Sequence, residues 1–305
     1  MNQNSIYFKQ VELLIEVLPY VSMDNFFALK GGTAINLFIR DFPRLSVDID
    51  LMYLPVESRD QSLKNISRIF EEIAQKIEKQ IKFSKVNRLY QRNDSELSKL
   101  QVDKKGVRIK IEASPVTRGT VKEPQMMQNT SKVQEMFGFA MTSVVHFDDL
   151  YAGKICAALD RQHPRDFFDV RGLLDNEGIS DSLMDVFIVY LISSNQPISK
   201  ILEPNLINIS KIYEEQFVGM TKEPISLQVL EDTREELITT INQKLTPLHK
   251  EFLVGFKKGN PNWKLLPFDN ISELPSIKWK LLNLDKMDES SRLLATLKLE
   301  KVLYR

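Results

Sequence analysis

The sequence predicts an α+β protein with two domains: a mixed α/β domain over residues 1–147 and an all-helical domain over residues 148–305. Three observations support this prediction. The chain has 305 residues, which is long for one core and typical of two domains. Up to residue 147, helical apolar spacing alternates with short strand-like runs, and beyond it only helical spacing recurs. The composition, 43% hydrophobic and 27% charged, is that of a globular protein.

The elements of the first domain follow from periodicity. Apolar spacing predicts helices over residues 5–20, 31–40 and 58–80, and Ser58 is a suitable N-cap for the last. Alternation and strand-forming residue types predict strands over residues 46–54, 81–90, 96–103, 107–113 and 139–145. The sequence DKKG at residues 103–106 has the composition of a hairpin turn between two of these strands.

The second domain reads as a series of amphipathic helices without a repeat of fixed period. The predicted helices cover residues 148–161, 165–176, 180–194, 206–217, 229–245, 247–259, 276–284 and 288–302.

Composition excludes several classes of protein. No apolar run approaches about 20 residues, so we expect no transmembrane helix. The first ten residues, MNQNSIYFKQ, lack the pattern of a signal peptide, and the single cysteine, Cys156, cannot form an internal disulfide. The three histidines and this cysteine do not cluster, which argues against structural zinc. We therefore expect a cytoplasmic protein, with a monomer as the default.

Charge is unevenly distributed along a chain whose net charge is zero. Between Lys79 and Lys122 there are 12 Lys/Arg residues against 4 Asp/Glu, a net charge of +8. Such a segment can attract a polyanion such as RNA. A solvated face of a sheet is an equally good interpretation.

Two aspartates alternate with apolar residues in the strand expected at residues 46–54. Asp48 and Asp50 should share the face opposite Ile49. By the same alternation Glu112 points away from the core, and it can form a third carboxylate if the two strands are neighbours. Converging carboxylates repel one another unless a cation neutralises them, and oxygen ligands suit Mg²⁺ or Mn²⁺. Such ions can assist phosphoryl or nucleotidyl displacement. An acidic, solvated strand face is the alternative.

A glycine pair stands just ahead of this strand. Gly31, Gly32 and Thr33 open a predicted helix, whose N-terminal N–H groups favour an anion, and glycine permits close approach to phosphate. The pattern is neither a P-loop nor a dinucleotide-binding motif. An ordinary helix entry is the alternative. Together with the acidic pair, however, it suggests a nucleoside triphosphate.

A second polar cluster lies at residues 151–171. Lys154 and Arg161 are seven residues apart and share a helical face, and Pro164 can begin the next helix. Asp166 then falls in a first turn, with Asp169 three residues later. Either Asp166 is a capping residue, or Lys154 contacts the triphosphate while Asp166 or Asp169 orients a basic residue.

The ordered motifs resemble a known family. The segments LKGGTAINLF, LSVDIDL, IKIEAS, DLYAGKICAALDRQHPRDFFDV and KWKLLNL resemble the AbiEii/AbiGii nucleotidyltransferase toxin family, within the DNA polymerase β-like nucleotidyltransferase superfamily. The resemblance spans about residues 25–300. It implies a mixed-sheet nucleotidyltransferase domain followed by a helical domain. It also implies a toxin of a toxin–antitoxin or phage-defence system with a cognate antitoxin.

The resemblance assigns roles residue by residue. Those implied for nucleotide binding are Gly31, Gly32, Thr33, Ser46 and Lys154, where Ser46 opens the Ser-x-Asp-x-Asp segment. Those implied for catalysis are Asp48, Asp50, Glu112, Lys154, Asp166 and Asp169, with Asp48, Asp50 and Glu112 as metal ligands. Glu112 departs from the superfamily, in which aspartate is commoner at this position.

The function implied by the resemblance is transfer of NMP from an NTP, with Mg²⁺ or Mn²⁺, to an acceptor and release of pyrophosphate. The expected acceptor is the 3′ end of tRNA, whose modification would block translation. A protein or small-molecule hydroxyl is an alternative acceptor. A non-enzymatic protein that binds only a nucleotide or an antitoxin is the third hypothesis.

Overall fold

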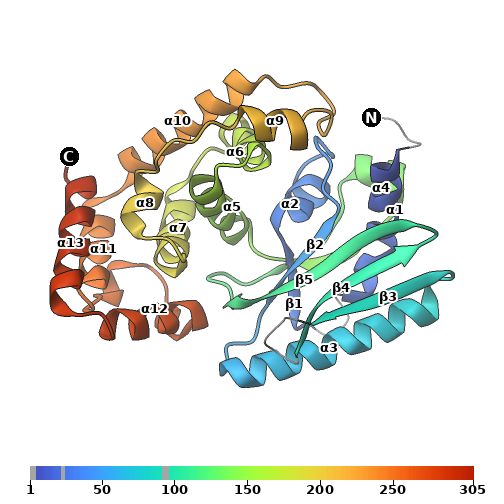
Figure 1. The fold of residues 1–305 in the computed structure, drawn as a ribbon, viewed down its shortest axis with the longest axis horizontal. Coiled ribbons are helices and arrows are strands. Elements are labelled where there is room, and N and C mark those ends of the chain that lie inside the picture. The colour runs from blue at the N-terminus through green and yellow to red at the C-terminus, as the bar shows by residue number, and fades with distance from the viewer. Residues whose placement is uncertain (1–4, 22–24, 91–95) are drawn as a thin grey trace. The chain divides into compact units, whose positions relative to one another are not determined.

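The chain divides into two compact units in the computed structural model, which describes residues 5–21, 25–90 and 96–305 (Figure 1). Unit 1 comprises Met1–His146 together with Gly219–Glu223, and unit 2 comprises Phe147–Val218 and Pro224–Arg305. The α+β class predicted from the sequence is confirmed, because strands occur in unit 1 and the described part of unit 2 is helical.

Unit 1 is built on a mixed sheet. Its strands, in the described residues, lie in the order β3-β4-β5-β2-β1-β7-β6. Strands β2 and β5 run parallel, as do β1 and β7, and the other neighbours are antiparallel. The strand bounds are β1 Phe27–Lys30, β2 Asp48–Tyr53, β3 Ser84–Tyr90, β4 Leu97–Lys104, β5 Val107–Arg118, β6 Gln125–Gln128 and β7 Met141–Val144.

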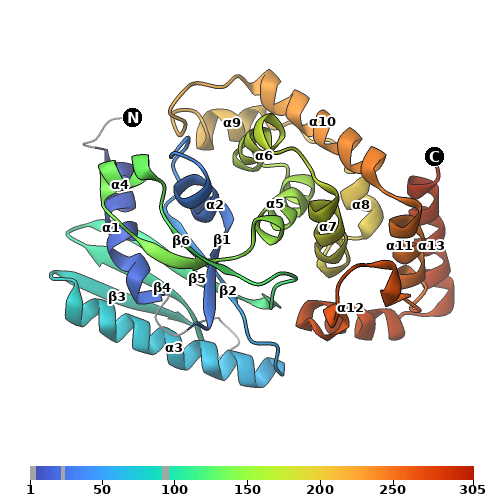
Figure 2. The ribbon, with the colours of Figure 1, turned by 180° about the vertical axis from the view of Figure 1, so that it is seen from behind.

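Two helices, α1 (Ile6–Val21) and α3 (Arg59–Gln80), pack against the sheet and against each other (Figure 2). Ile49 of β2 and Ile111 of β5 are fully buried, whereas their neighbours Asp48 and Lys110 are exposed. The sheet therefore has an apolar face and a polar face, as the alternation predicts. Ser58 accepts a hydrogen bond from Gln61 N at 3.3 Å, which confirms it as the N-cap of α3.

The structure differs from the sequence-based expectation in several short elements of unit 1. The helix expected at residues 31–40 consists of an α-helical turn, α2 (Gly31–Ala34), followed by a π-helical segment, η1 (Ile35–Ile39). The elements β1, β6 and α4 (Ser131–Phe137) were not predicted, because each is too short to show a clear period. The hairpin turn at residues 103–106 is confirmed, and its central residues Lys105 and Gly106 both have positive φ, 54° and 83°.

Unit 2 is a helical bundle around buried aromatic residues that include Phe167, Phe187 and Phe252. Its α-helices, in the part of the chain described, are α5 Phe147–Arg161, α6 Pro164–Asn176, α7 Asp181–Ser193, α8 Ile198–Leu202, α9 Ser210–Gln216, α10 Leu227–Lys244, α11 Pro247–Lys257, α12 Pro275–Asp285 and α13 Glu289–Leu303. Helix α9 begins four residues later than expected, and the short α8 was not predicted. The described helices include none that is long and apolar enough to span a membrane.

A distant segment completes unit 1. Leu45 N donates to Met220 O and Lys222 N donates to Pro43 O, both at 2.8 Å, and Arg44 forms an isolated bridge with Thr221. These bonds hold the chain just ahead of β2. Nothing in the local sequence pattern indicates this pairing.

Candidate functional site

The acidic pair of β2 lies beside Glu112 on the polar face of the sheet. Strands β2 and β5 are adjacent and parallel, with Asp50 opposite Glu112 and Asp48 opposite Lys110. The condition set by the sequence, that the two strands be neighbours, is met. Asp48 is exposed, and Asp50 and Glu112 are partly buried.

A row of four charged residues crosses four strands at this level. Lys99 of β4 pairs in register with Glu112, and its Nζ lies 2.8 Å from Glu112 Oε1. Lys30 of β1 pairs in register with Asp50. Burial lowers the pKa of the Lys30 ammonium, and the nearby charges of Asp50 and Glu112 offset part of that effect. Two lysines therefore flank two carboxylates on one face, which reduces the repulsion between the acids.

The glycine turn lies directly against Asp50. Gly31 has φ +75°, a left-handed conformation, and a Cβ placed on it would lie 2.9 Å from Asp50 Oδ2. A Cβ on Gly32 would lie 2.6 Å from Arg44 Nη2 and 2.9 Å from the Ser46 hydroxyl. Gly31 is required both for the left-handed backbone conformation and for the close approach to Asp50, whereas Gly32 serves the close approach to Arg44 and Ser46. The turn, Ser46 and the acidic strand thus form one packed group.

Thr33 fastens this turn to the acidic strand. Its hydroxyl donates to the carbonyl oxygen of Asp48 at 2.6 Å and lies 3.0 Å from the Ser46 hydroxyl. The Thr33 side chain is buried, so it holds the geometry between the helix entry and the start of β2. The nucleotide-binding role expected for Thr33 stays a prediction, and its observed contacts are those of a positioning residue.

The donor set suits a hard divalent cation that keeps part of its water shell. The described residues contain no cluster of three His, Cys, Asp or Glu side chains placed to hold a metal. Asp48, Asp50 and Glu112 lie on one face of the sheet, but the Glu112 carboxylate is paired with Lys99. Mg²⁺ is commonly held by one or two carboxylates, with waters and substrate phosphates completing its shell. Asp48 and Asp50 fit this mode, and Glu112 as a third ligand stays a prediction.

The second predicted cluster assembles within unit 2. Lys154 of α5 is buried, and its Nζ lies 2.9 Å from Asp166 Oδ1 and 2.8 Å from Asp169 Oδ2, both on α6. The side chain of Arg161 is 62% exposed, and its Nε lies 2.5 Å from Asp166 Oδ2. The aspartates therefore orient basic groups, which is one part of the second interpretation. The other part, contact of Lys154 with the triphosphate, stays a prediction.

Electrostatics keep Asp166 ionised. Burial alone would raise the pKa of its carboxyl, but the cations Lys154 and Arg161 outweigh burial and hold that pKa well below its usual range. His163 caps α6, because its Nδ1 accepts from Arg165 N at 3.1 Å, and Pro164 occupies the first helical position. The motif thus builds the helix entry that presents Asp166 to Lys154.

Three residues of this site were not predicted from the sequence: Lys30, Lys99 and Arg44. Lys99 could have been found, because counting back from the turn at residues 103–106 pairs it with Glu112. Lys30 could not, because the four-residue strand β1 was not predicted. Arg44 is buried and donates to Leu45 O at 2.8 Å, which no local pattern indicates.

Comparison with known proteins identifies the family of this chain. A family model described as "Nucleotidyl transferase AbiEii toxin, Type IV TA system" matches residues 12–281. The solved structure of MenT4, a nucleotidyltransferase toxin from Mycobacterium tuberculosis H37Rv, is similar with a TM-score of 0.58 at 14% identity, covering 98% of this chain and 92% of MenT4. That similarity shows a shared fold. A search of curated proteins finds no match. The family match extends over most of the chain, and the chain therefore belongs to the AbiEii nucleotidyltransferase toxins of type IV toxin–antitoxin systems.

Proposed function

We propose that this nucleotidyltransferase transfers NMP from an NTP to the 3′ end of tRNA and so blocks translation. The observation that carries the proposal is the packing of the Gly31 turn against Asp50, which brings a helix entry suited to phosphate next to an acidic pair suited to metal. A bound Mg²⁺ or Mn²⁺ would neutralise charge on the triphosphate and activate the attacking hydroxyl.

The residues of the first unit have distinct tasks in this reaction. The backbone N–H groups at Gly31 and Gly32 bind a phosphate, and Asp48 and Asp50 hold the cation. The acceptor hydroxyl oxygen attacks the α-phosphorus, the bond from that phosphorus to the bridging oxygen breaks, and pyrophosphate leaves. In this step the Glu112 carboxylate leaves its ion pair with Lys99 and accepts the proton of the acceptor hydroxyl.

The residues of the second unit have a supporting role in the proposal. Lys154 supplies positive charge for the nucleotide, and Asp166 and Asp169 position its ammonium. Both aspartates contact Lys154, and Asp166 also contacts Arg161. We therefore expect Asp166 to be the more sensitive of the two positions.

Cations on the polar face of the sheet favour RNA as the acceptor. Part of the +8 segment is used internally, because Arg88 is bound by Glu71 and Glu78, and Lys104 by Glu16. By register, however, Lys85 and Lys110 lie on the same face as Asp48, and both are exposed. Lysines beside the acidic strand can follow the phosphates of a strand whose end enters the site.

The decisive experiment incubates the protein with total tRNA and each α-³²P-labelled NTP in turn, with Mg²⁺ or Mn²⁺. We expect label at RNA 3′ ends with at least one NTP, and none with an Asp48→Ala variant that keeps its fold. The Lys85→Gln/Lys110→Gln double variant should label RNA less, with a shallower dependence on salt. An absence of labelled RNA across all four NTPs would refute tRNA as the acceptor.

A protein or small-molecule hydroxyl is the second candidate acceptor, and the same chemistry serves it. Digestion of the labelled product with nuclease or protease separates the two cases. The non-enzymatic hypothesis loses its support, because the family to which the chain belongs is one of nucleotidyltransferases. In the cell we propose a cytoplasmic monomer, held in check by a cognate antitoxin and active in phage defence.

A further inference from the structure

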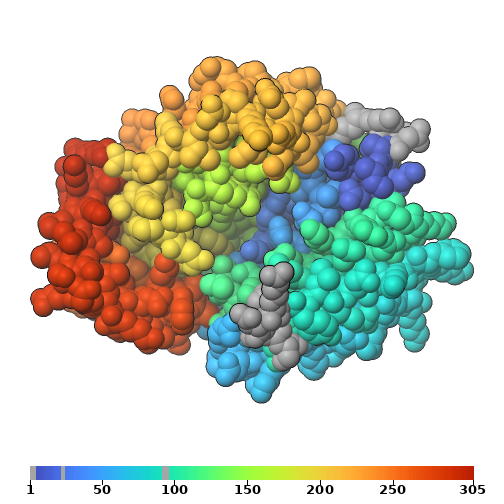
Figure 3. Space-filling view, in the orientation of Figure 1, coloured from blue at the N-terminus to red at the C-terminus, as the bar shows by residue number. Residues whose placement is uncertain are grey.

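A cavity of about 440 Å³ lies within unit 2, between α8, α11 and α13. In the space-filling view the yellow chain near residue 200 adjoins the red chain near residue 300 (Figure 3). The volume of the cavity is within the range of small-molecule sites. No carboxylate of the described residues lines the cavity. Its cationic lining residues are Lys200, Lys257 and Lys298, and its apolar ones include Ile198, Met287 and Leu294.

The positive charge of this cavity is uncompensated. Among the described residues, none lies within salt-bridge distance of Lys200, Lys257 or Lys298, whereas the neighbouring Lys258 is bound by Glu300 at 3.1 Å. Burial lowers the pKa of Lys257, and burial together with the charge of Lys257 lowers the pKa of Lys280. Of the three lysines that line the cavity, Lys257 is half-buried, and Lys200 and Lys298 are exposed. A half-buried charge without a counterion is costly, and a bound anion would remove that cost.

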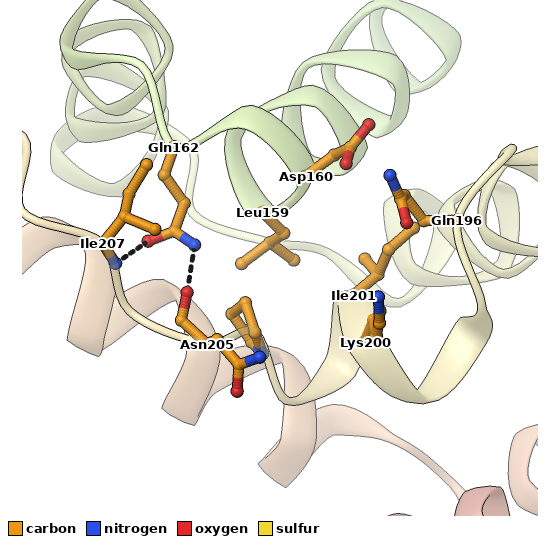
Figure 4. A pocket seen from close by; sticks show the side chains of 9 residues that line it. Leu159, Asp160, Gln162, Gln196, Lys200, Ile201, Asn205 and Ile207 are labelled. Carbon is orange, nitrogen blue, oxygen red and sulfur yellow. Dashed lines mark hydrogen bonds between the residues drawn. The ribbon is translucent and has the colours of Figure 1, made fainter.

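A smaller cavity of about 200 Å³ shares Lys200 but has a different character (Figure 4). One of its amide side chains, Gln162, donates to Asn205 O at 2.7 Å and accepts from Ile207 N at 3.2 Å, so this amide is used within the protein itself. Asp160 adds a negative charge to the lining. An anion therefore finds no comparable site there.

We propose that the cavity between α8, α11 and α13 binds a nucleoside monophosphate unit, either as a free nucleotide or as part of an RNA strand. Lysine ammonium groups bind phosphate as point charges. The phosphate monoester of a free nucleotide carries nearly two negative charges, and each phosphodiester of an RNA strand carries one. The hydroxyls of Ser199 and Ser291, which also line the cavity, can donate to phosphate oxygens. The apolar wall formed by Ile198, Met287 and Leu294 takes the base and sugar. This site is formed by residues of unit 2, whereas the acidic strand belongs to unit 1, and the proposal does not depend on the proposed reaction.

The test is equilibrium binding of AMP to the full chain in EDTA, which removes metal-dependent binding at the acidic strand. We expect saturable binding that is unchanged in Asp48→Asn, weakened about tenfold in Lys257→Gln, and altered less than about twofold in Lys258→Gln. Lys258 is the matched control, because it follows Lys257 in sequence and is already paired. Equal AMP affinity in the two lysine variants, or no saturable binding by the wild type, would overturn the proposal.

Lysine acetylation read by mass spectrometry tests the same site without any substitution. AMP should slow acetylation of Lys257 and Lys298 and leave Lys258 unchanged. Protection by inorganic phosphate alone, equal to that by AMP, would overturn the nucleoside part of the proposal. A short RNA that competes with AMP at lower concentration would identify an RNA strand as the source of the ligand, and failure to compete would identify a free nucleotide.

Discussion

Asp50 of β2 and Glu112 of β5 face each other as register partners on adjacent parallel strands, and Lys30 and Lys99 are the next partners on either side. This four-strand row balances two negative charges with two positive ones. A cation that binds at Asp50 therefore enters a site that already contains protein cations, and the flanking lysines should tune its affinity.

Replacement of Lys30 by methionine should strengthen divalent cation binding. The Lys30 ammonium repels an incoming cation, and its loss should raise the affinity for Mn²⁺ about tenfold, which corresponds to about 1.4 kcal/mol. Titration with Mn²⁺ followed by electron paramagnetic resonance measures the change. Lys105→Met, at the hairpin tip, is the control and should leave the affinity unchanged. A weaker affinity for Mn²⁺ in Lys30→Met would contradict this prediction and would mean that Lys30 helps to position Asp50 as a ligand.

Gly31→Ala should disrupt the site more than it disrupts the fold. Alanine at φ +75° costs roughly 1–2 kcal/mol, and its Cβ would also displace the Asp50 carboxylate. Gly106→Ala is the matched control, because Gly106 has φ +83° and no neighbouring heavy atom of the described residues lies within 4 Å of the position that a Cβ would take. Both variants should lose similar stability in thermal unfolding, whereas only Gly31→Ala should lose about 100-fold in NMP transfer. Equal activity in the two variants would contradict the contact.

Lys154→Met should be strongly destabilising, whereas Arg161→Met should not. Lys154 is the buried partner of two buried carboxylates, and removal of one member of a buried ion pair costs about 3–5 kcal/mol. The Arg161 side chain is 62% exposed, so its replacement should lower the free energy of unfolding by no more than about 1 kcal/mol. Urea unfolding gives both values, and equal losses would mean that the cluster does not depend on Lys154.

The contribution of Asp166 to stability should be lost only in acid. The lowered pKa of Asp166 means that the folded state holds its carboxylate ionised more readily than the unfolded chain, whose value is about 3.9. The stabilisation is therefore fully present above about pH 5 and is lost as the pH falls below about 4 through the folded pKa. The difference in unfolding free energy between the wild type and Asp166→Asn should be constant above that window and shrink within it. A difference that grows in acid would contradict the assigned sign.

Local sequence pattern was sufficient for the long elements and for the faces of the strands. The period-two alternation around Ile49 and Ile111 predicted which side chains leave the core, and Ser58 and Pro164 marked helix starts that the structure confirms. The hairpin at residues 103–106 even contains the information that places Lys99 beside Glu112. Short elements such as β1 were not predicted, because four residues are too few to define a period.

The sequence by itself determined the polar strand face, the glycine turn and the motif order that resembles the AbiEii/AbiGii family, because these depend on residues close together in the chain. Only the tertiary structure decided that β2 and β5 are parallel neighbours with Asp50 opposite Glu112, and that Lys30 completes the row. The tertiary structure also decided that Leu45, just ahead of β2, donates a backbone hydrogen bond to Met220. Strand pairing and such long-range hydrogen bonds join residues far apart in sequence, so no local period encodes them.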